Sequence, residues 1–400
     1  MKTSKAAHLS IKKKVHAKEH EAGVSHGDWG LLLIIMTLCL VGLMMVYSTS
    51  STLAWKHYGD SAYYLKRQIL WTVLGVGSFS FMVQTDYHRL SESIIFVAAG
   101  IFALLILVHF FGVEVNGARR WLRIGAISFQ PSEFAKLFTV IYLAHYIAKK
   151  EERLSDFVRG LWPILLMLGM MSFLIWIEPD LGTTLTIAII TVILLFIGGA
   201  SLRHLAWLSS LVIPFVIFSL IQFPYMLQRV KTYIDPMADH PAQSFQINQS
   251  YIALGSGGPF GRGLGEGLQK LFFLPQPHTD FIFSVIGEEW GLIGTTSVIL
   301  LFVALLWKGA KIVQRIEDPF GQILAMGTTL LMVMPALMNM GVVTALLPTK
   351  GLALPFISYG GSSLLMNWTA AGILYRISKD IPLRRSKKKE KILQMEALHA

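Results

Sequence analysis

Charged residues are scarce in this chain. Asp, Glu, Lys and Arg make up 15% of its 400 residues and hydrophobic residues make up 54%, whereas soluble domains carry about 25% charged residues. The mean hydropathy is correspondingly high, at +0.56. This composition excludes a soluble globular fold and predicts that the chain lies in a lipid bilayer.

Several signatures of soluble enzymes are missing as well. No Gly-Lys dipeptide occurs, which excludes a P-loop, and the stretch GSGGPFGRGLGEG does not satisfy G-x-G-x-x-G, so we expect no nucleotide cofactor. There is no H-E-x-x-H motif and no Cys/His cluster to suggest zinc. The single cysteine, Cys39, excludes an internal disulfide. Despite a net charge of +11, nothing resembles a nucleic-acid-binding module, and we predict no nucleic acid partner.

What the sequence has instead is a series of long apolar stretches. They predict an all-α integral membrane protein with about ten transmembrane helices, because irregular backbone cannot face lipid. The shorter stretches are also compatible with re-entrant or interfacial segments, and residues 161–199 with one bent element instead of a hairpin. The predicted spans are 29–48, 68–84, 93–111, 132–148, 161–177, 181–199, 205–223, 281–307, 321–345 and 355–375.

The distribution of Lys and Arg predicts the orientation of these spans. Residues 1–28 and 379–400 form basic tails around one membrane domain, 29–378, and an even number of spans places both tails on one side. That side carries 23 Lys and Arg residues and the other side 11, so both termini are predicted to be cytoplasmic. The first span has no cleavage site and is expected to remain as an anchor. The long connection 224–280 then lies outside the cell, and its length and glycines favour a shaped, functional loop.

Two ionisable residues lie inside the fourth span. Glu133 and Lys136 are three positions apart, so they share one helix face and can form an ion pair near its outer end. Ionisable groups within a membrane span are functional candidates by default. A structural ion pair that locks two helices is the alternative.

An arginine cluster faces outward, against the usual charge bias. Arg119, Arg120 and Arg123 surround Trp121, which is expected at the membrane interface. Guanidinium groups match the oxygens of phosphate, so the cluster suits a phosphate ligand, although binding of lipid headgroups alone is the alternative.

Acidic residues occur where two outer connections meet spans. Glu178 and Asp180 form a turn, and Asp180 is expected to cap the helix that follows. Asp280 opens the eighth span, either as a similar helix cap or as a base toward a hydroxyl, in a cavity with the outer cations that include Lys350. Deeper in that span, Glu288 and Glu289 need a partner or a water-filled cavity.

These regions also carry a resemblance to a known family. From about residue 29 to 378 the chain resembles the SEDS family of peptidoglycan glycosyltransferases, and the segment PTKG, with Lys350, is similar to the division-type branch more than to the elongation type. Gln276, Ala345 and Ala353 stand where the family commonly has Glu, Gly and Pro, and the two alanines are interpreted as packing variation. The matching motifs are NGARRWLRIGAISFQPSEFAKL, EPDLGTT, QSYIALGSGGPFGRGLGEGLQKLFFLPQPHTDFIFSVIGEEWGLIG and MNMGVVTALLPTKGLALPFISYGGSSLL.

The resemblance implies an inverting glycosyltransferase that polymerises lipid II, a disaccharide-pentapeptide on undecaprenyl pyrophosphate, into a glycan strand for the division septum. It implies a class B penicillin-binding protein (an FtsI-type transpeptidase) and other divisome membrane proteins as partners, with binding through the outward faces of spans eight and nine. The family's essential acid matches Asp280, here assigned as the base and as a possible ligand of Mg or Mn. At a helix N-terminus its pKa is expected to be low. The residues assigned to substrate binding are Arg119, Arg120, Trp121, Glu133, Lys136, His278, Lys350 and Ser358.

Two other classes of protein are compatible with part of this pattern. A lipid II flippase would use the same cavity and buried charges but would need alternating access, and the sequence shows no clear inverted repeat. A scaffold that only recruits a divisome partner would need helix surfaces and no polar cavity.

Overall fold

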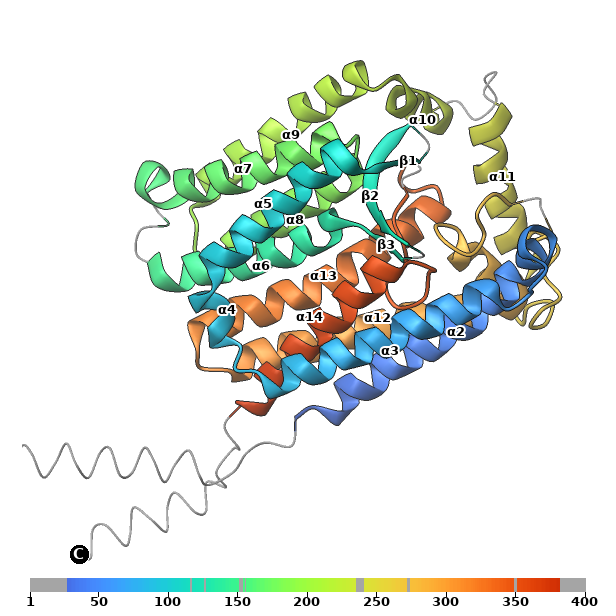
Figure 1. Cartoon of the computed structure of the whole chain (residues 1–400), viewed down its shortest axis with the longest axis horizontal. Coiled ribbons are helices and arrows are strands. Elements are labelled where there is room, and N and C mark those ends of the chain that lie inside the picture. The colour runs from blue at the N-terminus through green and yellow to red at the C-terminus, as the bar shows by residue number, and fades with distance from the viewer. Residues whose placement is uncertain are drawn as a thin grey trace, which may run out of the picture.

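The structure is a computed structural model that describes residues 27–381, apart from 116, 126, 151–153, 155, 235–240, 272–273 and 349–350. Helices dominate it (Figure 1). They are α2 (Trp29–Tyr58), α3 (Tyr63–Gln84), α4 (His88–Glu92), α5 (Ile94–Phe111), α6 (Pro131–Lys150), η2 (Phe157–Leu161), α7 (Trp162–Ile177), α8 (Leu181–Ile197), α9 (Leu202–Gln222), α10 (Pro224–Ile234), α11 (Pro241–Ser256), α12 (Ile282–Arg315), α13 (Pro319–Val343) and α14 (Gly361–Lys379).

Each of the ten predicted spans corresponds to a helix among the described residues. The helices are α2, α3, α5, α6, α7, α8, α9, α12, α13 and α14, and they run along one elongated bundle (Figure 1). Six of the described helices are long and apolar enough to cross a membrane, and the 17-residue helix α8 is apolar but shorter. A turn at Glu178–Asp180 separates α7 from α8, so residues 161–199 form a hairpin. The all-α, multi-pass prediction is therefore confirmed.

Helix α13 lies at the centre of the bundle, with α12, α6, α14 and α8 packed around it. It is apolar on all sides, which is typical of a helix surrounded by protein. Small residues bring its neighbours close. A Cβ on Gly327 would lie 2.3 Å from Val140 of α6, and one on Gly309 of α12 would lie 2.1 Å from Thr329. This close packing holds α6 and α12 directly against α13.

A glycine-rich segment closes over a kink in α12. Gly291 interrupts the helix with φ 67°, and a Cβ there would lie 2.3 Å from the nitrogen of Gly261. The amide of Leu292 donates to the carbonyl of Gly258 (2.9 Å), and the amide of Arg262 donates to the carbonyl of Glu288 (3.0 Å). The glycines permit this close backbone contact, which gives the predicted shaped loop its form.

The connection between α9 and α12 holds α10 and α11, which were not predicted. A second difference is a small antiparallel sheet between α5 and α6, formed by β1 (Val113–Val115), β2 (Ala118–Ile124) and β3 (Ile127–Phe129) in the order β1-β2-β3. The sheet and α10 lie at the same end of the bundle (Figure 1). Strands this short give no periodic signal that sequence reasoning can recognise.

The first and last described segments meet at the opposite end of the bundle (Figure 1). The amide of Asp28 donates to Oγ of Ser378 (3.1 Å), and the carboxylate of Asp28 forms an ion pair with Lys308 (2.7 Å). This agrees with an even number of spans. The predicted domain bounds and the side of the membrane stay predictions, because residues 1–26 and 382–400 lie outside the described residues.

Candidate active site

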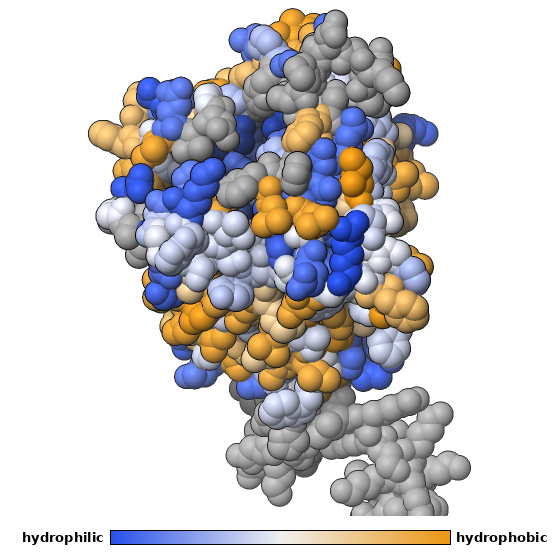
Figure 2. Space-filling model, turned by 90° about the vertical axis from the view of Figure 1, so that its right-hand side faces the viewer, coloured by the Kyte–Doolittle hydropathy of each residue, from blue (hydrophilic) through white to orange (hydrophobic). Residues whose placement is uncertain are grey.

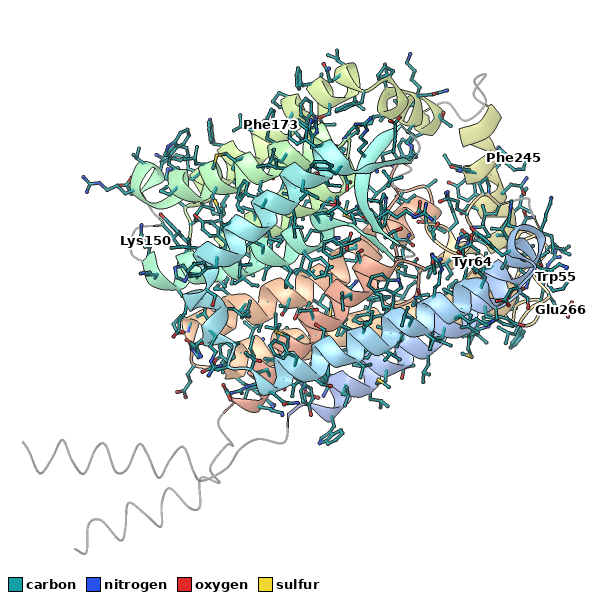
Figure 3. All side chains as sticks on the ribbon, in the orientation of Figure 1. Trp55, Tyr64, Lys150, Phe173, Phe245 and Glu266 are labelled. Carbon is teal, nitrogen blue, oxygen red and sulfur yellow. The ribbon has the colours of Figure 1, made fainter. Side chains whose placement is uncertain are left out.

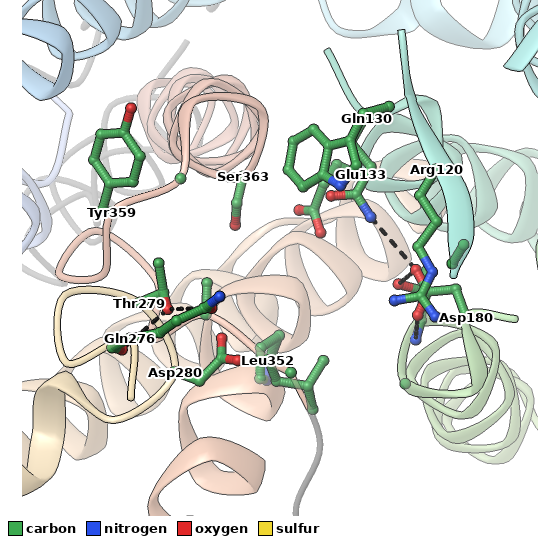
Figure 4. A pocket seen from close by; sticks show the side chains of 18 of the residues that line it. Arg120, Gln130, Glu133, Asp180, Gln276, Thr279, Asp280, Leu352, Tyr359 and Ser363 are labelled. Atoms are coloured by element: carbon green, nitrogen blue, oxygen red, sulfur yellow. Dashed lines mark hydrogen bonds between the residues drawn. The ribbon is translucent and has the colours of Figure 1, made fainter. Parts of the chain in front are cut away.

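A polar cavity of about 660 Å³ lies at the end of the bundle that carries the small sheet. Its walls come from α3, β2, the start of α6, the α7–α8 turn, α10, the segment 275–281, the segment 351–361 and α14. Figure 2 looks onto this end, where hydrophilic residues gather among hydrophobic ones. In Figure 4, Asp280 lies on one side of the cavity and Arg120 with Asp180 on the other.

The cavity brings together about half of the residues predicted to bind substrate or to catalyse. Those that line it are Arg120, Trp121, Glu133, Lys136 and Asp280. Three others, Arg119, His278 and Ser358, are not part of its lining. Lys350 lies outside the described residues, although its neighbour Gly351 does line the cavity.

Asp280 is not the helix cap that the sequence also allowed. The N-cap of α12 is Phe281, and its carbonyl accepts from the amides of Ser284 (3.0 Å) and Val285 (3.4 Å). Within the described part of the chain, the Asp280 carboxylate accepts no hydrogen bond from a backbone amide or another side chain, and it faces the cavity. The helix begins one residue too late for Asp280 to cap it. Its oxygens are therefore available to a ligand.

The pKa of Asp280 also differs from the expectation. Burial raises it from 3.8 to about 6, and the positive charge of Arg229 on α10 opposes this rise. The low pKa predicted from a helix N-terminus is wrong, because the carboxylate makes no hydrogen bond to the first turn and loses water instead. A pKa close to the working pH makes Asp280 a better general base.

Hydrogen bonds to three successive carbonyl groups hold the backbone at Asp280 in place. Their donors come from α13 and from the segment that precedes α14. The bonds run from the Tyr359 amide to the His278 carbonyl (2.9 Å), from Ser358 Oγ to the Thr279 carbonyl (2.6 Å) and from Asn339 Nδ2 to the Asp280 carbonyl (2.7 Å). Asn339 also donates to the carbonyl of Leu352 (2.6 Å). The catalytic candidate is thus positioned by a rigid, buried frame.

His278 and Ser358 belong to this frame and do not face the cavity. The ring of His278 is packed against Tyr64, with the ring centroids 4.6 Å apart, and burial lowers its pKa to about 4, which keeps it neutral at pH 7. Ser358 Oγ accepts from the amide of Leu354 (2.8 Å) while it donates to Thr279. Their place in the structure therefore supports a positioning role in preference to direct contact with substrate.

Glu133 and Lys136 form the predicted ion pair. Lys136 Nζ lies 2.8 Å from Glu133 Oε1, and both side chains are buried on α6 at the cavity wall. Glu133 Oε2 has no hydrogen-bond partner among the described residues. The pair keeps two opposite charges at the cavity without an unpaired charge in the bundle.

The three arginines of the predicted cluster do not share one environment. Arg120 of β2 lines the cavity, whereas Arg119 of the same strand is exposed and pairs with Glu114 (3.6 Å). Arg120 Nε donates to the carbonyl of Glu178 (2.9 Å), and its Nη2 donates to that of Pro179. Arg123 lines the cavity as well. The cluster thus contributes two cations to the cavity and one to the outer surface.

Sequence reasoning missed two cations that line the cavity. Arg67 comes from α3 and Arg229 from α10, and both were counted only as loop charges in the topology prediction. The available signal was that both arginines occur on the predicted outer side, which carries fewer Lys and Arg residues than the side of the termini. With Arg120, Arg123 and Lys136, they give the cavity lining five cationic side chains against the three carboxylates of Glu133, Asp180 and Asp280, so cations are in excess.

In the acidic turn between α7 and α8, Asp180 is the helix cap that the sequence predicted. Asp180 caps α8 by accepting from the amide (3.0 Å) and the hydroxyl (2.8 Å) of Thr183. Glu178 is buried, and burial, followed by the charge of Asp180, raises its pKa to about 8. It is therefore largely protonated at pH 7, which avoids a buried charge.

Glu288 and Glu289 have the partners that their depth requires. Glu289 pairs with Lys270 (2.7 Å) and accepts from Ser48 Oγ of α2 (2.7 Å). Glu288 accepts from the amide of Leu268 (2.8 Å). These buried contacts attach the glycine-rich segment to α12 and α2, directly before the segment that leads to Asp280.

The carboxylate side chain of Asp280 is compatible with a divalent cation, but the described residues form no complete binding site for one. Among the described residues there is no group of three His, Cys, Asp or Glu side chains that could hold a metal ion. Mg²⁺, however, often binds through one or two carboxylates together with substrate phosphates and water. The carboxylate of Asp280, which makes no hydrogen bond within the part of the chain that the structure describes, fits that mode of binding.

The fold and the cavity define a class of protein: a multi-pass membrane protein with a cationic cavity and one positioned carboxylate at one end. Residues 29–381 match the model of the cell cycle protein family FtsW/RodA/SpoVE. The chain belongs to this family, and the SEDS prediction is confirmed.

Relatives and solved structures agree with this assignment. The chain is 42% identical to the probable peptidoglycan glycosyltransferase FtsW of Trichlorobacter lovleyi, with 89% of this chain and 94% of the relative covered. It is 38% identical to the stage V sporulation protein E of Bacillus subtilis, with 87% and 96% covered. A solved chain from a study of polymerization and crosslinking by a peptidoglycan synthase complex is similar, with a TM-score of 0.71, 25% identity, and 90% and 99% covered. RodA of Thermus thermophilus has a TM-score of 0.64, 25% identity, and 90% and 98% covered.

Proposed function

We propose that this chain, a peptidoglycan glycosyltransferase of the FtsW type, polymerises lipid II into glycan strands at the outer face of the cytoplasmic membrane for septal wall synthesis. The observation that carries the proposal is the cavity itself. It combines the carboxylate of Asp280, which accepts no hydrogen bond from the described residues, with cations in the cavity lining. The relatives named as peptidoglycan glycosyltransferases support the reaction class.

The reaction needs a base and a site for a pyrophosphate leaving group. The 4-hydroxyl of the acceptor sugar attacks the anomeric carbon of the donor, the bond from that carbon to the pyrophosphate oxygen breaks, and the configuration inverts. Asp280 takes the hydroxyl proton. Its pKa of about 6 leaves it ionised at pH 7 and still basic enough to accept a proton.

The cations of the cavity would bind the leaving group. Arg123 and Lys136, with Arg67, Arg120 and Arg229, are placed around the space that Asp280 faces. Charge-assisted hydrogen bonds from guanidinium groups are short and strong toward phosphate oxygens. Such donors stabilise the negative charge that develops on pyrophosphate in the transition state.

The carboxylate of Asp280 would hold a divalent cation at the cavity. When bound, Mg²⁺ or Mn²⁺ would neutralise charge on the leaving group. The chain's own contribution is the carboxylate and the frame of Asn339 and Ser358 that positions it.

The partner is proposed to be a class B penicillin-binding protein of the FtsI type, together with lipid II, the nascent strand and other divisome membrane proteins. The similarity to a chain of a peptidoglycan synthase complex supports the transpeptidase. Of the two predicted contact helices, α13 is mostly buried and offers little outward surface. Helix α12 instead exposes an apolar stripe with Leu300, Val303 and Trp307. We therefore place the partner's helix on α12.

The decisive experiment measures glycan polymer from purified protein co-expressed with its penicillin-binding partner and supplied with lipid II and Mg²⁺ or Mn²⁺. We expect polymer from the wild type and none from Asp280→Asn, which keeps the shape of the side chain but cannot accept the proton. The control is Asp86→Asn, which removes an exposed acid that pairs with His88 and does not line the cavity. Polymer from both variants would refute the role of Asp280. Transport of lipid II across vesicles without polymer from any variant would instead indicate a flippase.

A further inference from the structure

A cluster of tyrosines at the ends of α2 and α3 plays no part in the proposed chemistry. Tyr58 is the last residue of α2 and Tyr63 the first of α3. Their rings are stacked, with centroids 3.8 Å apart and planes 10° from parallel. Tyr64 meets Tyr63 edge to face at 5.3 Å. Figure 3 shows Tyr64 and Trp55 at this end of the two helices.

This tyrosine cluster continues into the wall of the cavity at two points. Tyr64 packs edge to face against Tyr359 at 5.1 Å, and Tyr359 lines the cavity. The guanidinium carbon of Arg67 lies 4.6 Å from the ring centroid of Tyr63, and Arg67 also lines the cavity. A chain of aromatic contacts therefore runs from Tyr359 in the cavity wall through Tyr64 and Tyr63 to Tyr58.

Tyr58 presents an open ring at the outer end of the cluster. Tyr63 covers one face of the ring and Tyr64 meets it in a T-shaped contact (6.0 Å), yet Tyr58 is 52% exposed, so part of the ring is accessible. The turn after it is well defined, because Gly59 adopts φ 68° with its amide bonded to the Trp55 carbonyl (2.9 Å). An ion pair between Lys66 and Asp60 (2.7 Å) closes the turn.

An aromatic belt at the membrane interface would also place tyrosines at helix ends. The rings of such a belt stand against lipid headgroups, whereas these rings stack on one another and on a cation that faces the cavity. Sugar rings suit this arrangement. Their axial C–H groups form an apolar face that stacks on an aromatic ring, and their hydroxyls and acidic substituents reach donors at its edge, such as the Tyr hydroxyls and Arg67.

We propose that Tyr58, supported by Tyr63 and Arg67, binds the glycan strand as it leaves the cavity. This inference rests on the proposed function and adds a binding site for its product. A strand held at the cavity mouth after each addition stays at a high effective concentration for the next one. The tyrosine cluster would thus increase the number of sugars added before the strand is released.

The test compares the length of the glycan strands made by Tyr58→Leu with that of the wild type, in complex with the penicillin-binding partner. Leucine keeps an apolar side chain at position 58 but removes the face of the aromatic ring. We expect strands several-fold shorter, with a smaller effect on the initial rate of lipid II consumption. The control is Phe111→Leu, an exposed aromatic at the end of α5, which should change neither quantity. Strands of wild-type length would overturn the inference, whereas absence of polymer from the wild type would refute the proposed function itself.

A binding measurement separates strand recognition from catalysis. N-acetylglucosamine hexamer serves as the probe for thermophoresis with the detergent-solubilised full chain. We expect weaker binding by Tyr58→Leu and retained binding by Tyr58→Trp, which restores an aromatic face. Equal affinity of the leucine and tryptophan variants would show that the ring does not contact sugar.

Discussion

The chemistry depends on the surroundings of single side chains, and Asp280 is the clearest case. Its side chain is one among many acids at the ends of spans, and the sequence allowed a cap or a base. The structure separates the two, because Phe281 caps α12 and the carboxylate of Asp280 faces a cationic cavity. The surroundings of the side chain shift its pKa from the value that is usual for an aspartate.

The raised pKa of Asp280 predicts the pH dependence of polymerisation. A base must be unprotonated to act, so the rate should be high above pH 6 and fall as the pH drops through about 6. An acid with the ordinary value of 3.8 would keep its activity down to about pH 4. Initial rates between pH 5 and 8 distinguish these cases, and a flat profile from pH 5 to 7 would contradict the assignment.

The element scale shows how helix ends and loops are held. Helix α13 ends in a motif in which the amide of Leu346 bonds to the carbonyl of Gly341 (2.7 Å) and that of Ala345 to Val342 (3.0 Å). Ala345 has φ 45°, a position at which glycine is preferred after a helix. The interpretation of Ala345 as packing variation is therefore wrong, because backbone conformation explains why the family commonly has glycine there.

Replacement of this alanine should stabilise the protein. Ala345→Gly relieves the cost of a left-handed residue but increases the freedom of the unfolded chain, so we expect a gain of about 0.5–1 kcal/mol. Thermal unfolding in detergent measures the change. Ala353→Gly is the control, since Ala353 is not in the left-handed region, and that variant should be no more stable than the wild type.

The glycine-rich segment depends on a buried ion pair. Lys270→Met would leave Glu289 buried without its cation, and loss of one partner of a buried pair costs about 3–5 kcal/mol. We expect faster proteolysis within residues 257–280 and loss of activity, because this segment leads to Asp280. The double variant Lys270→Met/Glu289→Gln removes both charges and should recover part of the stability. A single variant as resistant as the wild type would show that the pair does not hold the segment.

At the scale of the whole molecule, the bundle separates two ends. The cavity, the small sheet and α10 occupy one end, and the first and last described segments meet at the other (Figure 1). The excess of Lys and Arg near the termini predicts that this end is cytoplasmic. The cavity would then open to the outside of the cell, where lipid-linked sugars are joined.

Cysteine labelling tests this orientation. In a Cys39→Ser background, Glu266→Cys places a thiol on the exposed glycine-rich segment at the cavity end, and Lys388→Cys places one in the C-terminal tail. A maleimide that does not cross membranes should label the first in intact cells and the second only after permeabilisation. The reverse pattern would invert the proposed topology.

The sequence by itself determined the membrane class, the positions of ten helices and the family. These follow from apolar stretches and long motifs, which are local along the chain. It also placed Asp280, Glu133 and Lys136 near one another, because the same end of the bundle was expected to hold them.

Only the tertiary structure decided which side chains share the cavity. Arg67 and Arg229 line it from α3 and α10, while Arg119, on a strand that the sequence did not reveal, is exposed and pairs with Glu114. The frame around Asp280 depends on Asn339 and Ser358, which lie about 60 and 80 residues away in sequence. Such contacts depend on how distant helices pack, and no local pattern of residues encodes them.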